Sequence, residues 1–91
     1  MKKRVHIYYS GMVQGVGFRF TAEEMANTLG LTGWAKNLPD GKVEVLCEGE
    51  KADLVSFIDK MKSGSMRDYI RSADVEWGES RNEFENFTVL F

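Results

Sequence analysis

The chain has 91 residues, a formal net charge of −2, a hydrophobic fraction of 43% and a charged fraction of 29%. These values predict one globular domain spanning residues 1–91 and disfavour general nucleic-acid binding, which depends on a basic surface. One cysteine excludes an intrachain disulfide, and one distant histidine makes a zinc site improbable. No apolar run follows Lys2-Lys3-Arg4 as it would in a signal peptide, so we predict a cytoplasmic protein with no membrane partner.

Hydrophobic periodicity predicts a β-α-β-β-α-β order with a short additional strand at the end. In chain order, the expected elements are strand 4–10, a helix that begins between Phe18 and Thr21 and ends before Gly30, strand 31–38, strand 42–48, helix 51–62, strand 70–77 and strand 87–91. Both helices carry an apolar stripe and the sheet has one apolar face. We therefore expect an α+β, ferredoxin-like two-layer sandwich, with an antiparallel sheet and both helices on one face.

Three local features accompany these elements. Thr21 and Glu24 have the spacing of a capping box at the start of the first helix. His6 falls on the polar face of the first strand, where we expect it to be solvated. Cys47 lies in an apolar strand flanked by glutamates, which favours a small buried hydrophobe over a reactive thiol.

The candidate site begins where the first strand ends. Gly11, Gly15 and Gly17 precede Arg19, and a helix opens immediately afterwards. Glycines let backbone N–H groups converge on an anion, a helix N-terminus adds donors, and arginine adds a planar charged fork. This arrangement predicts a cradle for a phosphoryl group, although glycines can also simply turn a strand into a helix.

Two better-known phosphate loops fit less well. The Lys-Ser or Lys-Thr pair of a P-loop is missing from the sequence. The glycine spacing is closer to that of a dinucleotide-binding loop, but that fold needs a parallel sheet of several βαβ units, for which the chain is too short. A second polar candidate, Asn37, lies just before the Pro39-Asp40-Gly41 turn, where asparagine by itself is an ordinary turn residue.

Taken together, two motifs resemble the acylphosphatase family. They are Gly11-x-Val13-Gln14-Gly15-Val16-x-Phe18-Arg19 and Gly33-Trp34-Ala35-Lys36-Asn37-x-x-x-Gly41-x-Val43-x-x-x-x-x-Gly49. The resemblance covers the whole chain and implies hydrolysis of a carboxylic–phosphoric anhydride to a carboxylate and inorganic phosphate. It implies that Arg19 binds the phosphate together with five backbone amides, and that Asn37 orients the attacking water. The five amides are those of Gln14, Gly15, Val16, Gly17 and Phe18.

The same resemblance implies a small-molecule acyl phosphate as substrate, inorganic phosphate as product or competitive inhibitor, and no metal or organic cofactor. The chemistry is consistent with this, because a carboxylate leaves without a general acid and phosphoryl transfer depends mainly on positioning and charge. Two other interpretations remain: a non-catalytic anion-binding module, and an RNA-recognition module, which lacks its basic aromatic motif here. A carboxylate at Phe91 is also a candidate partner for the Arg19 guanidinium. A monomer is the default expectation for so compact a domain.

Overall fold

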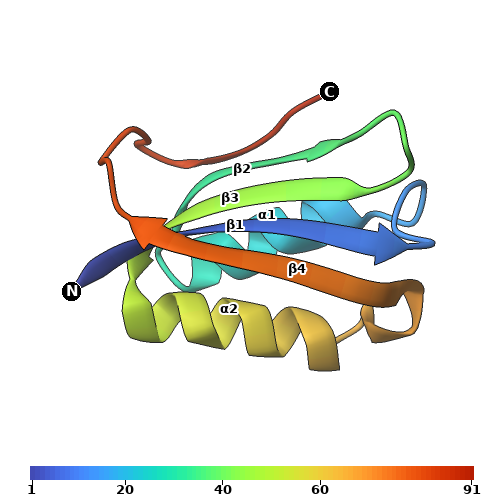
Figure 1. Cartoon of the computed structure of the whole chain (residues 1–91), viewed down its shortest axis with the longest axis horizontal. Helices are drawn as coiled ribbons and strands as arrows, with labels where there is room; N and C mark the ends of the chain where they lie inside the picture. The colour runs from blue at the N-terminus through green and yellow to red at the C-terminus, as the bar shows by residue number, and fades with distance from the viewer.

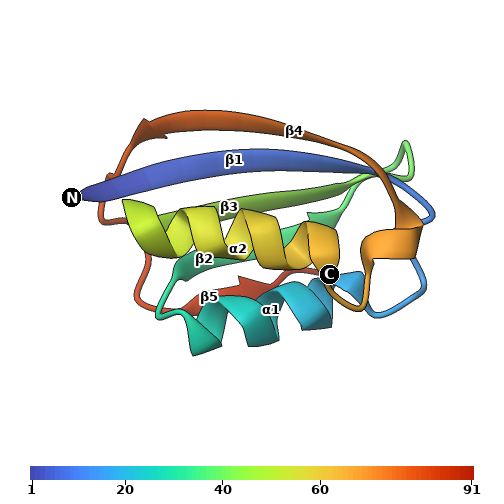
Figure 2. The ribbon, with the colours of Figure 1, turned by 90° about the horizontal axis from the view of Figure 1, so that it is seen from below.

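A computed structural model describes all 91 residues, and both helices lie on one face of a five-stranded sheet (Figures 1 and 2). The predicted ferredoxin-like α+β architecture is confirmed. The elements are β1 (Lys2–Gly11), α1 (Phe18–Thr28), β2 (Thr32–Asn37), β3 (Val43–Glu50), α2 (Lys51–Ser63), the short 3-10 helix η1 (Arg67–Tyr69), β4 (Ile70–Glu79) and β5 (Phe87–Val89). Neither α1 nor α2 has the length and hydrophobicity that a membrane-crossing helix requires.

The strand order is β4-β1-β3-β2-β5, and the prediction of a purely antiparallel sheet is wrong at its last strand. Three neighbouring pairs are antiparallel, but β5 pairs with β2 in parallel. The reason is the connection after β4, which passes around the end of the sheet where β2 begins (Figure 1). Glu48 anchors this connection by accepting the N–H groups of Arg81 at 2.8 Å and Glu83 at 3.4 Å. The chain therefore enters β5 in the same direction as β2.

The core lies between the sheet and the helices, as the apolar stripes predicted. Its largest fully buried side chains are Tyr9, Phe18, Phe57, Ile7, Leu54, Met61, Val5, Val13, Val43, Val45 and Cys47. The prediction that Cys47 is a buried hydrophobe is confirmed, and burial raises the pKa of its thiol.

The predicted capping box of α1 is wrong. The helix begins at Phe18, so Thr21 lies inside the first turn and its Oγ1 donates to the Gly17 carbonyl at 3.0 Å. Gly17 occupies the N-cap position in the left-handed region, with φ of +79°, and no side chain caps the helix. At the other end Gly30 adopts the left-handed conformation, with φ of +70°, as a residue that ends a helix often does.

Side chains on the open face of the sheet form a hydrogen-bonded cluster that the alternating pattern did not predict. His6 lies on this face, as predicted, but it is not simply solvated. Its Nε2 lies 2.5 Å from Oε2 of Glu44, which also accepts the Tyr8 hydroxyl at 3.2 Å. The His6 ring stacks on Tyr8 with 4.8 Å between centroids. Long-range pairing between β1 and β3 brings these side chains together, and the sequence of either strand alone does not reveal it.

Candidate active site

The glycine-rich loop lies between the end of β1 and the start of α1. Gly15 and Gly17 have φ values of +77° and +79°, a region that residues with a Cβ adopt at a cost. No backbone N–H from Gln14 to Phe18 has a hydrogen-bond partner within the chain. The loop and the uncapped helix N-terminus therefore present a run of free donors together with the positive end of the helix dipole.

Arg19 is the second residue of α1, and its guanidinium is held by the chain segment after β5. Its Nη1 donates to the Leu90 carbonyl at 2.6 Å, and its Cζ lies 4.9 Å from the centre of the Phe91 ring. The candidate ion pair of Arg19 with a Phe91 carboxylate is not observed, and the acceptor is the Leu90 backbone carbonyl instead. A guanidinium has five N–H donors, so this anchor leaves most of them available to an anion.

Asn37 is the last residue of β2 and is exposed. The position of Asn37 relative to Arg19 follows from the contacts between β2 and the chain after β5. The Leu90 N–H donates to the Ala35 carbonyl at 2.8 Å, and the carbonyl of the same Leu90 accepts from Arg19. Asn37 lies two positions beyond Ala35, about 7 Å along the strand. The structure thus places the predicted guanidinium and the predicted carboxamide at the same end of the sheet.

The side chain of Gln14 connects the loop to the β2–β3 hairpin. Its Nε2 donates to the Leu38 carbonyl at 2.8 Å and to the Lys42 carbonyl at 2.9 Å. The sequence pointed to Gln14 only for its backbone amide, and it did not point to Leu90 at all. A backbone carbonyl carries no residue-type signal, so only the folded chain reveals that partner.

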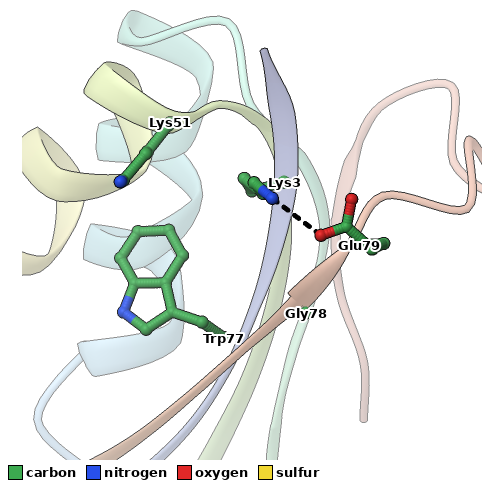
Figure 3. Close-up of a pocket in the computed structure, with 5 residues that line it drawn as sticks. All are labelled: Lys3, Lys51, Trp77, Gly78 and Glu79. Carbon is green, nitrogen blue, oxygen red and sulfur yellow. Dashed lines mark hydrogen bonds and ion pairs between the residues drawn. The ribbon is translucent and has the colours of Figure 1, made fainter.

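A separate groove of about 310 Å³ lies at the opposite end of the sheet (Figure 3). Lys3 and Glu79 form an ion pair of 2.7 Å at its edge, and the Trp77 indole stands beside Lys51 of the first turn of α2. Most of the length of β1 separates this groove from the glycine loop, so it takes no part in the candidate site.

Comparison with known proteins decides the family. The profile described as "Acylphosphatase" matches residues 5–89. The chain belongs to the acylphosphatase family. The acylphosphatase of Caldanaerobacter subterraneus subsp. tengcongensis is 37% identical over 89 residues, covering 98% of this chain and 99% of that protein. The acylphosphatase of Archaeoglobus fulgidus is 41% identical over 87 residues, covering 96% and 97%.

The crystal structure of an acylphosphatase from Bacillus subtilis has the same fold, with a TM-score of 0.91. It is 35% identical in sequence, and the match covers 98% of this chain and 99% of that one. The predicted family and enzyme class are thus confirmed, and this acylphosphatase is a hydrolase. The roles predicted for Arg19, Asn37 and the loop amides are a separate matter and depend on the geometry above.

Proposed function

We propose that this chain hydrolyses the carboxyl–phosphate anhydride of small-molecule acyl phosphates. In this proposal the guanidinium of Arg19 and the amides of Gln14, Gly15, Val16, Gly17 and Phe18 hold the phosphoryl group, and Asn37 orients the attacking water. The observation that carries the proposal is the run of unpartnered N–H groups beside a guanidinium that is already fixed by Leu90. Such preorganised donors stabilise the charge that phosphoryl transfer spreads over the equatorial oxygens.

The side-chain amide of Asn37 both donates and accepts hydrogen bonds. Asn37 is exposed at the end of β2, so its amide is free to bind a water molecule and a phosphoryl oxygen together. A water held in line with the bond to be broken reacts far more readily than one from bulk solvent, because positioning lowers the barrier by several kcal/mol. The leaving carboxylate departs without a proton donor, so we assign Asn37 to the nucleophile rather than to the leaving group.

In the proposed reaction the water oxygen forms a bond to phosphorus, and the bond between phosphorus and the acyl oxygen breaks. The electron pair of that bond leaves with the carboxylate, whose conjugate acid has a pKa of about 4 to 5. Such a group departs without a general acid. The proton of the water passes to an oxygen of the phosphate, so the products are a carboxylate and inorganic phosphate.

Finer features of the proposal concern the molecule in solution. We propose one domain over residues 1–91, a monomer and a cytoplasmic location. Inorganic phosphate would act as a competitive inhibitor, because the loop and Arg19 would hold the free anion as they hold the phosphoryl group.

The test is hydrolysis of benzoyl phosphate, with inorganic phosphate as competitor and a chelator control. Arg19→Ala should raise KM and lower kcat, since the guanidinium binds the phosphate in the ground and transition states alike. Asn37→Ala should lower kcat while the inhibition constant of phosphate stays within about twofold. Arg81→Ala and Asn27→Ala are matched controls, because both side chains are exposed. Arg81 follows the end of β4 that pairs with Lys3, at the far end of β1 from the loop, and Asn27 lies in the last turn of α1.

A non-catalytic phosphate-binding module would bind inorganic phosphate without turnover. That result would overturn the enzymatic proposal for this chain. If the Asn37→Ala variant turned over as fast as the wild-type protein, the water-orienting role would be wrong. If phosphate inhibited the Arg19→Ala variant as strongly as the wild-type protein, the phosphate-binding role would be wrong.

A further inference from the structure

The side chain of Gln14 bridges two parts of the proposed site that are distant in sequence. Its two amide protons go to two different carbonyls, those of Leu38 and Lys42, at 2.8 Å and 2.9 Å. Each proton of the NH₂ group has one acceptor, so the donor capacity of the amide is fully used. The side chain is half-buried, so water has limited access to both hydrogen bonds.

The two acceptors belong to the two arms of one hairpin. The Leu38 N–H donates to the Lys42 carbonyl at 2.8 Å, and the Gly41 N–H donates to the Leu38 carbonyl at 3.1 Å. Gln14 therefore contacts the hairpin at its base, on both arms at once. A contact with one arm would fix a single point of the hairpin, whereas two contacts fix both its distance from the loop and its orientation.

The residue next to this contact is Asn37, which immediately precedes Leu38 in the chain. On the other side of the contact is the loop whose amides form the proposed phosphate cradle. The loop is attached to β1 and α1, whereas Asn37 is attached to β2. The amide of Gln14 thus links the proposed phosphate-binding group directly to the residue next to the proposed water-binding group.

We propose that the side chain of Gln14 is a positioning residue, which sets the placement of Asn37 relative to the phosphate-binding loop. This inference rests on the roles proposed above for the loop and Asn37. An error of about 1 Å in the placement of a reacting group can lower a rate by about 100-fold. The linkage acts on the approach of water to phosphorus and leaves the binding of phosphate to the loop amides and Arg19 intact.

The test uses Gln14→Met, which keeps the length and apolar stem of the side chain and removes both donors. We expect kcat for benzoyl phosphate to fall by about 10- to 100-fold. We expect the inhibition constant of inorganic phosphate to change by less than about twofold, because the backbone amide of residue 14 is retained. Cys47→Ala is the control for destabilisation, since Cys47 is buried in β3 and contacts neither the loop nor the hairpin turn.

A double-mutant cycle then separates positioning from general support of the fold. If Gln14 acts through Asn37, adding Gln14→Met to Asn37→Ala should lower kcat by less than about twofold further. An equal and independent loss in the double variant would overturn the inference, as would unchanged kcat in Gln14→Met. A rise in the inhibition constant of phosphate that matched the fall in kcat would also overturn it, because Gln14 would then support the cradle itself.

The outcomes also distinguish this inference from the proposed function. If wild-type protein failed to hydrolyse benzoyl phosphate, or if Asn37→Ala were fully active, the proposed function or the role of Asn37 would fail first. If both behaved as expected and only the cycle failed, the role of Gln14 alone would be wrong.

Discussion

Gly33 offers the sharpest stability test, because it lies in β2 between two neighbouring strands. It is opposite Cys47 of β3 and Phe87 of β5, and its φ is +138°. A Cβ added at this position would lie 1.8 Å from the Leu46 carbonyl oxygen and 2.8 Å from the carbonyl carbon. Both obstacles are backbone atoms, so no side-chain rotation relieves the clash. Gly33→Ala should therefore push β2 away from β3 or force a change of its backbone conformation.

The size of the effect follows from these distances. An ordinary van der Waals contact begins near 3.4 Å, so β2 must shift by roughly 1.5 Å, enough to break about two ladder hydrogen bonds at ~1 kcal/mol each. The unfavourable backbone conformation adds about 1–3 kcal/mol. The expected loss of about 3–5 kcal/mol is a large part of the 5–15 kcal/mol that typically separates a folded domain from its unfolded state.

The assay is urea unfolding followed by tryptophan fluorescence. With a slope of about 1 kcal/mol per molar urea, the midpoint for Gly33→Ala should fall by about 3 M or more, or the variant should be unfolded without urea. Gly78→Ala is the matched control, because Gly78 lies in β4 with nothing within 4 Å of an added Cβ and without a positive φ. The free energy of unfolding of Gly78→Ala should differ from that of the wild-type protein by less than about 0.5 kcal/mol. Equal stability of the two variants would refute the reasoning.

Two further predictions concern buried groups. Burial raises the pKa of the Cys47 thiol in the folded state, so the unfolded chain loses this proton first as pH rises. The contribution of Cys47 to the free energy of unfolding is therefore fully present below about pH 8.5. Above that pH it falls by up to ~1.4 kcal/mol per pH unit. Between about pH 8.5 and 10, before the phenol of Tyr9 contributes, the free energy of unfolding measured by urea titration should fall less steeply with pH in Cys47→Ala than in the wild-type protein. The same slope in both proteins would contradict this prediction. Glu48→Ala should lower the free energy of unfolding by about 3 kcal/mol, because it removes a buried acceptor of the Arg81 N–H. It should also speed hydrogen exchange of the backbone amides in segment 80–86. Glu83→Ala removes the exposed partner of the half-buried Arg4, which Glu48 also neutralises, so it should lower the free energy of unfolding by less than about 1 kcal/mol. Equal losses in the two variants would count against the anchoring role.

Much of the fold and of the candidate site follows from local pattern. The alternation of β1 and the apolar stripes of the two helices predict which faces are buried. Side chains on one face recur every 2 residues in a strand and about every 3.6 residues in a helix, and the apolar residues of these elements follow those periods. The glycine loop followed by Arg19 was recognisable because both its backbone freedom and its charge are properties of residue type. The family motifs then assigned Asn37 a role that its own position could not suggest.

Other features depend on contacts between residues distant in sequence. The helix α1 begins at Phe18, within the predicted range, but its N-cap is Gly17 in a left-handed conformation, which the capping pattern of Thr21 does not predict. The parallel pairing of β5 depends on the connection after β4, which passes around the end of the sheet where β2 begins (Figure 1). The anchoring of Arg19 by Leu90 likewise depends on that pairing.

The sequence by itself determined which chemical groups the proposed site can use for phosphate and for water, and which faces of the elements must be buried. The tertiary structure alone decided how those groups are held relative to one another. Their anchors are backbone carbonyls, those of Leu38 and Lys42 for Gln14 and that of Leu90 for Arg19. Almost every residue has such a carbonyl, so no pattern of side chains distinguishes the ones that are used, and only the three-dimensional path of the chain selects them.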